Sequence, residues 1–173
     1  MRNRTSPHLH RQGAGTSLPE LLCVMVLLGI VLAAAAPAMD QLTARHRLVA
    51  ATNSLVTGLH FARHSAVYSR RTASLCPSRA PARCGSNEDW QHGWYVHAPA
   101  HAPVRDSYSG TLPARITVRL SQGRQQVRFQ PDGRSPGSNI TLHLCSHGIM
   151  QRQIVVNNAG RVRSTPITHT PCD

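Results

Sequence analysis

An uncharged apolar run near the amino terminus constrains this chain more than any other feature of its sequence. Residues 21–36 have the sequence LLCVMVLLGIVLAAAA and carry no charged side chain. A helix continued from Thr16 to Ala38 contains about 23 residues and measures roughly 34 Å at 1.5 Å per residue, enough to cross a bilayer. We therefore expect a membrane-spanning helix at residues 16–38.

The residues before this run do not have the order of a secretory signal peptide. In such a peptide the apolar region precedes the cleavage site, whereas here Gly15 and Thr16 precede the apolar region. A cut between them would leave the helix in the mature protein. Residues 1–15 also contain three arginines and no acidic residue, which predicts a cytoplasmic amino terminus and an exported carboxyl-terminal side.

The helical pattern continues beyond Pro37 to about Tyr68, and Arg70 and Arg71 mark its expected end. In this part the apolar residues recur at spacings of three and four, with arginine and histidine between them. The apolar residues are Leu42, Val49, Leu55, Val56, Leu59 and Ala62. We expect residues 39–70 to form the amphipathic half of one long helix that packs on a head domain.

From Thr72 onward the pattern predicts strands and turns. Apolar and polar side chains alternate at residues 115–120, 127–130, 140–144 and 154–156, with turns expected at 131–133 and 157–160. The stretches 78–86 and 98–110 are expected to be loops. A helix packed on an antiparallel sheet satisfies both patterns, so the predicted fold class is α+β with one head domain at residues 71–173.

Five cysteines occur, and their distribution indicates the redox compartment of the head. Cys23 lies in the apolar run, whereas Cys76, Cys84, Cys145 and Cys172 lie in the polar remainder. An even number of cysteines in an exported domain predicts two disulfides formed in an oxidising compartment.

The junction GTSLPE at residues 15–20 resembles the cleavage site of type IV prepilins, in which Gly precedes Phe-Thr-Leu-Ile-Glu and an apolar helix. The resemblance implies that prepilin peptidase cuts after Gly15 and that Thr16 becomes an N-methylated terminus. It also implies that Glu20 pairs with the terminal amine of a neighbouring subunit and that Pro37 bends the helix. Two residues depart from the usual site: Thr16 replaces Phe, and Pro19 replaces an aliphatic residue.

The head resembles the FimT/GspH group of minor pilins and pseudopilins, and is closest to FimT. Residues 74–97 (SLCPSRAPARCGSNEDWQHGWYVH) have the Cys-Pro, second Cys, Trp and Gly-Trp of that group in the same order. RFQPDGRS at 128–135, the strand ending at Cys145 and IVVNNAGRVR at 154–163 fit the same pattern. In this arrangement Cys76 and Cys84 close a short loop and are the expected first disulfide. Cys145 and Cys172 would then tie the tail to the sheet.

The resemblance implies a type IV pilin fold with a cleaved leader at residues 1–15. It further implies a single-pass inner-membrane protein with a periplasmic head that later joins the pilus fibre at the cell surface. The expected partners are prepilin peptidase, the inner membrane and other pilins of the filament. No cofactor is implied.

Residues Gly160-Arg161-Val162-Arg163 are the strongest candidate for a binding site. In an extended segment Arg161 and Arg163 point the same way about 7 Å apart, which is close to the spacing of successive phosphates on one nucleic-acid strand. Gly160 would permit the turn that presents them. A Gly-Arg-x-Arg motif near the carboxyl terminus resembles the one by which FimT-type minor pilins bind DNA in natural transformation.

Charge supports DNA as a partner. All 19 basic residues are arginine, and removal of the leader would lower the formal charge only from +12 to +9. Guanidinium groups bind phosphate through paired hydrogen bonds. Arg152 is expected to extend the site, and Arg115, Arg119 and Arg128 are further candidates. Two roles are open for the aromatic side chains of Trp90, Trp94 and Tyr95: stacking on bases, or packing in the core.

Other interpretations of the same residues compete with DNA binding. The arginine content also fits a GC-rich genome, and the Gly-Arg pair also fits a structural turn in a GspH-like pilus-priming or type II secretion subunit that binds no DNA. His143, Cys145 and His147 alternate along one strand and could form a zinc set, but Cys145 is expected to pair with Cys172, so no metal site is predicted. No nucleophile–base pattern occurs, which argues against an enzyme and leaves no catalytic residue to name.

Overall fold

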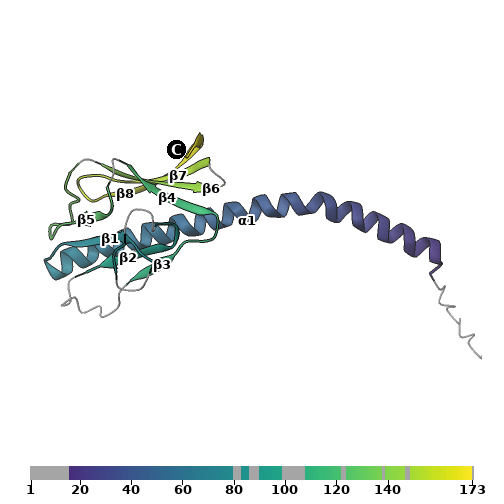
Figure 1. Ribbon diagram of the computed structural model, residues 1–173, viewed down its shortest axis with the longest axis horizontal. Helices are drawn as coiled ribbons and strands as arrows, with labels where there is room; N and C mark the ends of the chain where they lie inside the picture. Colours follow the sequence, from purple (N-terminus) through teal and green to yellow (C-terminus); the bar gives the residue numbers. More distant parts are fainter. Residues whose placement is uncertain are drawn as a thin grey trace, which may run out of the picture. The chain divides into compact units, whose positions relative to one another are not determined.

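The computed structural model describes residues 16–79, 83–85, 90–98, 108–121, 124–137, 139–146 and 149–172. These residues form one long helix followed by strands (Figure 1). The elements are α1 (Leu18–Ser69), β1 (Ala73–Pro77), β2 (Gly93–His97), β3 (Ser109–Thr111), β4 (Ile116–Leu120), β5 (Val127–Phe129), β6 (Ile140–Ser146), β7 (Ile149–Val156) and β8 (Val162–Pro171).

The chain divides into two compact units, one ending at Gln41 and one comprising Leu42–Asp173. In the first unit α1 is long and apolar enough to cross a membrane, and none of its most apolar 18-residue window is buried. Large apolar side chains such as Leu27 and Ile30 are more than half exposed. A helix that is apolar on all sides needs an apolar surrounding, which agrees with the expected membrane segment.

In the second unit α1 presents one apolar stripe to the head. The stripe residues are at most 5% exposed and lie three or four positions apart: Leu48, Ala51, Leu55, Leu59, Ala62 and Ala66. Two residues expected in the stripe, Leu42 and Val49, are exposed instead. Val49 follows Leu48 directly, so it points about 100° away from the buried face.

Close packing of α1 on the head requires a glycine at position 58. A Cβ atom added to Gly58 would lie 2.8 Å from both the Leu75 and the Trp94 side chains. The Trp94 ring therefore fills the space that any other residue would need on the helix. The cost of a glycine within a helix, about 1 kcal/mol relative to alanine, is offset by this burial.

The strands form two antiparallel sheets rather than the single sheet expected from the sequence. The first sheet has the order β3-β2-β1-β5 and the second the order β4-β6-β7-β8. Stretch 98–110, expected to be a loop, contributes Ser109 and Gly110 to β3, where they pair with Tyr95 and Trp94 of β2. Residues 99–107 lie outside the described part of the chain.

One hydrophobic core joins α1 to both sheets. It contains the helix stripe, residues such as Leu75, Val96 and Phe129 from the first sheet, and Leu142 and Ile154 from the second. The core depends mainly on aliphatic side chains because the chain is only 4% aromatic. Both tryptophans belong to this core, where their rings pack against other buried side chains.

Two disulfides reinforce the head at separate places. Cys76 pairs with Cys84, with Cα atoms 5.4 Å apart, and Cys145 pairs with Cys172, with Cα atoms 6.2 Å apart. The second bond closes 27 residues, which stabilises the fold by roughly 3–4 kcal/mol in the chain-entropy model. It fixes the end of β8 to β6, whereas Cys23 is an exposed free thiol on α1.

Candidate nucleic-acid interface

The turn between β7 and β8 presents the candidate motif. The N–H of Gly160 donates to the Asn157 carbonyl at 2.8 Å, and the N–H of Asn157 donates to the Arg161 carbonyl at 3.1 Å. The Asn157 side chain also accepts the N–H of Arg161 at 2.8 Å. Asparagine commonly stabilises turns in this way, so the backbone that carries Arg161 is fixed on both sides.

Gly160 is buried and allows the chain to form this turn. Its φ is +74°, a left-handed conformation that side chains disfavour. A Cβ atom at this position would collide with the carbonyl oxygen of Gly133. Gly160 was expected to permit the turn of the binding site, and its burial and positive φ fit that supporting role.

Arg63 of α1 ties this turn to the body of the head. Its Nε donates to the Gly133 carbonyl at 3.0 Å, and its Nη2 lies 3.4 Å from the Ala159 carbonyl, which accepts from it. One guanidinium thus joins the helix to the β5–β6 loop and to the β7–β8 turn. A planar group with several fixed donors suits such a double contact. This role could not be predicted from the sequence, because the partners lie 70 and 96 positions away.

Arg161 and Arg163 lie on either side of a residue that anchors the segment. Val162 is partly buried and packs against the hydrophobic core, while both arginines are exposed. Val162 pairs with Val156 and Arg163 with Val155 at the start of β8. Arg163 thus lies on β8, the last strand in the order of the second sheet, and Arg161 directly precedes that strand. Both side chains are open to solvent.

Arg152 does not join this pair. It lies opposite Leu144 of β6 in the β6–β7 ladder, and directly opposed residues share one face of a sheet. Leu144 is fully buried, so Arg152 lies on the core face of the sheet, whereas Arg163 shares the opposite face with Val155. The structure therefore does not bring Arg152 together with Arg163 on one face of the sheet.

Other arginines lie on the solvent side of the strands. Arg115, Arg119 and Arg128 are all exposed. Arg119 lies opposite His143, whose Nδ1 is buried without a hydrogen-bond partner among the described residues. Burial lowers the pKa of His143 from its ordinary value of 6.5, so at neutral pH this residue adds no charge to the surface.

The aromatic candidates for base stacking are not available. Trp90, Trp94 and Tyr95 are 1%, 2% and 8% exposed. A stacked base needs one free ring face, which none of these side chains offers. Any nucleic acid at this surface would be bound through arginines and amides.

The competing zinc set lacks its thiolate. Cys145 forms the disulfide with Cys172, so its sulfur cannot act as a thiolate ligand. His143 remains as a single imidazole, and His147 lies outside the described residues. In the part of the chain that is described, no group of three potential ligands comes together.

The expected processing site lies at the start of the described chain. Gly15 falls outside the described residues, and Thr16 and Glu20 are exposed. Glu20 is in the first turn of α1, where its charge is stabilised by the positive end of the helix dipole. The structure thus leaves this carboxylate open to contact with another molecule.

Comparison with known proteins agrees with this architecture. A family model described as "Type II transport protein GspH" matches residues 51–160, more than half of the chain. The crystal structure of type IV minor pilin FimU from Pseudomonas aeruginosa (strain PAO1) in one crystal form is 22% identical with a TM-score of 0.56, and the match covers 70% of this chain and 90% of that one. A second crystal form of FimU is 21% identical with a TM-score of 0.53, covering 68% and 91%. No curated protein matches the chain. The likeness to FimU shows a type IV pilin fold.

We predict that Gly160→Ala destabilises the head by about 2 kcal/mol or more, because the left-handed backbone alone disfavours a side chain by roughly 1–2 kcal/mol and the added methyl meets the Gly133 carbonyl. Chemical unfolding of the intact protein in non-ionic detergent measures this. Asn158→Ala is the matched control, since Asn158 is exposed in the same turn and should change stability little. Equal stability of the two variants would contradict the role assigned to Gly160.

Proposed function

Because the chain belongs to the GspH family of minor pilins and pseudopilins, we propose that it is a type IV minor pilin that binds DNA without sequence preference and supports DNA uptake. Proteins of this family are structural components of filaments and not enzymes. Membership accounts for the long apolar helix and for contacts with other pilins. DNA binding is the additional part of the proposal.

The observation that carries it is the exposed Arg161–Arg163 pair on a rigidly held turn. The Asn157 side chain accepts the Arg161 N–H and Arg63 donates to the Ala159 carbonyl, so little conformational freedom remains to be lost when the turn binds a ligand. Between Arg115 and Arg163 the sequence has eight arginines and one acid, Asp132. This region would therefore attract a polyanion.

The physics of such a contact determines its specificity. Arginine–phosphate contacts release counterions from DNA, and they carry no base information. Trp90, Trp94 and Tyr95 are buried, so none of these three rings offers a free face to a base. We therefore propose recognition of the DNA backbone, which suits a protein that must capture DNA of any sequence.

The pair can be tested with Arg161→Gln combined with Arg163→Gln. We expect the affinity of the intact, detergent-solubilised protein for duplex DNA to fall at least tenfold at about 0.1 M salt, because each lost phosphate contact removes roughly one released counterion. The slope of log affinity against log salt should become shallower by about 1.8. Fluorescence anisotropy of a labelled duplex measures both.

The control removes the same charge elsewhere: Arg45→Gln with Arg47→Gln. Both residues are exposed on α1, outside the strands and turns that carry the candidate arginines. This variant should keep most of the affinity. If both double variants bind DNA as the wild type does, the assignment to Arg161 and Arg163 is wrong.

The second candidate is a structural subunit of GspH type, for pilus priming or type II secretion, with no role in DNA binding. The burial of Gly160 against Gly133 favours it, since this contact explains the turn without any ligand. The absence of measurable DNA binding by the folded wild type at low salt would support this structural function. Salt-dependent binding of DNA by the wild type would contradict it.

We further propose that the chain is processed and assembled as a pilin. Prepilin peptidase would remove residues 1–15 and methylate Thr16, the helix would hold the protein in the inner membrane with the head in the periplasm, and the subunit would then enter the pilus. Glu20, exposed in the first turn, would pair with the terminal amine of the neighbouring subunit, which offsets the cost of a carboxylate at the membrane.

Intact mass of the protein purified from cells that contain prepilin peptidase tests this step. We expect a chain that begins at Thr16 and carries one additional methyl group. Replacement of Gly15 by a bulky residue such as Val should leave the leader attached. A chain of full length in the presence of active peptidase would contradict the proposed processing.

A further inference from the structure

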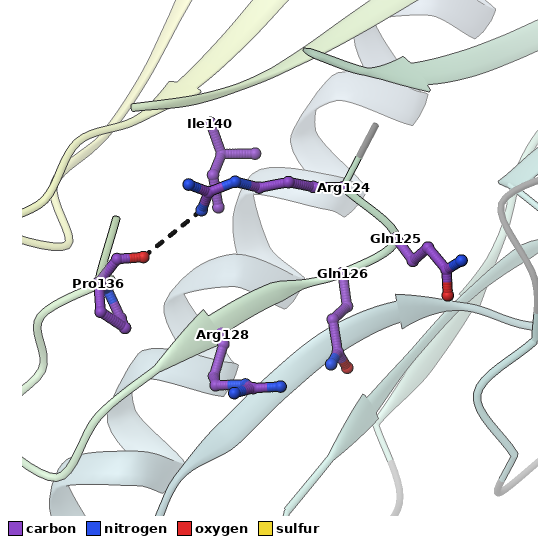
Figure 2. Close-up of a pocket in the computed structure, with 6 residues that line it drawn as sticks. All are labelled: Arg124, Gln125, Gln126, Arg128, Pro136 and Ile140. Atoms are coloured by element: carbon purple, nitrogen blue, oxygen red, sulfur yellow. Dashed lines mark hydrogen bonds between the residues drawn. The ribbon is translucent and has the colours of Figure 1, made fainter. Parts of the chain in front are cut away.

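Two shallow pockets lie side by side in the second unit of the chain, beside the candidate turn. The first, of about 260 Å³, is lined by Arg124, Gln125, Gln126, Arg128, Pro136 and Ile140 (Figure 2). The second, of about 270 Å³, is lined by Gln130, Arg134, Pro136, Gly137 and Asn158. Pro136 lines both, so the two pockets adjoin at this residue. We name the pair the Pro136 crevice.

The chemistry of the lining is that of an anion site. It combines three arginines with the amides of three glutamines and one asparagine, and it includes no acidic side chain. Asp132 is nearby in the sequence, but its carboxylate accepts the N–H of Arg134 at 3.0 Å and so completes the local turn. Guanidinium and amide groups all donate hydrogen bonds to phosphate oxygens.

The crevice is held in shape by hydrogen bonds within the backbone. Gly133 donates to the Gln130 carbonyl at 2.8 Å, and Gln130 donates to the Arg134 carbonyl at 2.8 Å. Arg124 reaches across the first pocket and its Nη1 donates to the Pro136 carbonyl at 3.4 Å, as Figure 2 shows. A pocket formed in advance binds its ligand with a smaller entropy loss than one that must be ordered on binding.

The crevice is continuous with the turn that carries Arg161. Asn158 lines the second pocket, and its carbonyl accepts the N–H of Ser135 at 3.1 Å. Ser135 is the neighbour of Pro136, and Arg161 is three residues beyond Asn158. A ligand with several phosphates in a row could therefore contact the turn and the crevice together, whereas a single phosphate could not.

We propose that the Pro136 crevice is a second phosphate-binding site, in which Arg128 and Arg134 bind the backbone of the same DNA that Arg161 and Arg163 contact. The inference rests on the proposed function, because it assumes DNA as the ligand. It adds that the footprint extends from the second sheet to β5 of the first sheet. Arg124 serves as a positioning residue, since its guanidinium already binds the Pro136 carbonyl.

The lining also determines which form of DNA is bound. Single-strand binding proteins gain much of their affinity from bases stacked on aromatic rings, and neither pocket has an aromatic residue in its lining. The crevice therefore recognises phosphates alone. A duplex, with its higher charge density, should bind more tightly than a single strand of the same length.

The test is Arg128→Gln combined with Arg134→Gln in the intact, detergent-solubilised protein, with the Arg45→Gln, Arg47→Gln double variant as the charge-matched control. Arg128 and Arg134 are exposed, so the fold should be retained, and circular dichroism checks this. We expect the affinity for a labelled duplex to fall at least tenfold at about 0.1 M salt, with a salt slope shallower by about 1.8. The single strand of the same length should bind more weakly than the duplex.

The outcomes separate this inference from the proposed function. Loss of affinity in the Arg161, Arg163 variant but not in the Arg128, Arg134 variant would overturn the crevice and leave the proposed function standing. Loss in the Arg128, Arg134 variant alone would support the crevice and overturn the assignment to the turn. Tighter binding of the single strand would overturn recognition by phosphates alone. A wild type that binds no DNA at low salt would overturn both.

Discussion

The burial of one stripe of α1 is the constraint on which the rest of the head depends. Leu55, Leu59 and Ala62 are completely buried and contact a core to which both sheets contribute. The stripe and both sheets share one cluster of buried side chains, in a chain that is only 4% aromatic. Full burial of a leucine or phenylalanine contributes about 1.5–3 kcal/mol, so the helix stripe adds several such contributions to the cohesion of the head.

The same helix also places the candidate site. Arg63 follows directly after the buried Ala62, and its guanidinium leaves the stripe to bind the carbonyls of Gly133 and Ala159. The β5–β6 loop and the β7–β8 turn are thereby fixed to one helical residue. Function and stability are linked through this contact, because a partly buried arginine of α1 holds the turn that carries the exposed Arg161. Charge that is fixed in position binds a regular polyanion better than charge on a mobile tail.

Much of the fold could be predicted from the sequence, because local periodicity determines it. The helix was expected to end near Tyr68 and ends at Ser69, and strands β4, β5 and β6 begin within one residue of the expected positions. The second sheet, the short β3 strand and the exposure of Val49 could not be predicted, since they depend on which strands pair and how the helix is rotated. Alternation within a strand does not tell which neighbour it joins.

The site was predictable only in part, for the same reason. The Gly-Arg-Val-Arg motif is contiguous, so its exposed arginines and its turn could be located. Spacing alone did not show which face of β7 Arg152 occupies, so its separation from Arg163 could not be predicted. Arg63, Arg124 and Arg134 were missed altogether. Their partners are distant in the sequence or are backbone carbonyls, which leave no pattern in a list of residues.

The most direct test of the central claim, that DNA binds at the turn held by Arg63, is hydrogen–deuterium exchange of the intact protein with and without duplex DNA. The account predicts slower exchange of the backbone amides in residues 157–163 when DNA is bound, reversed by high salt, with little change in β4. Salt-dependent binding of DNA that leaves exchange in residues 157–163 unchanged would contradict it.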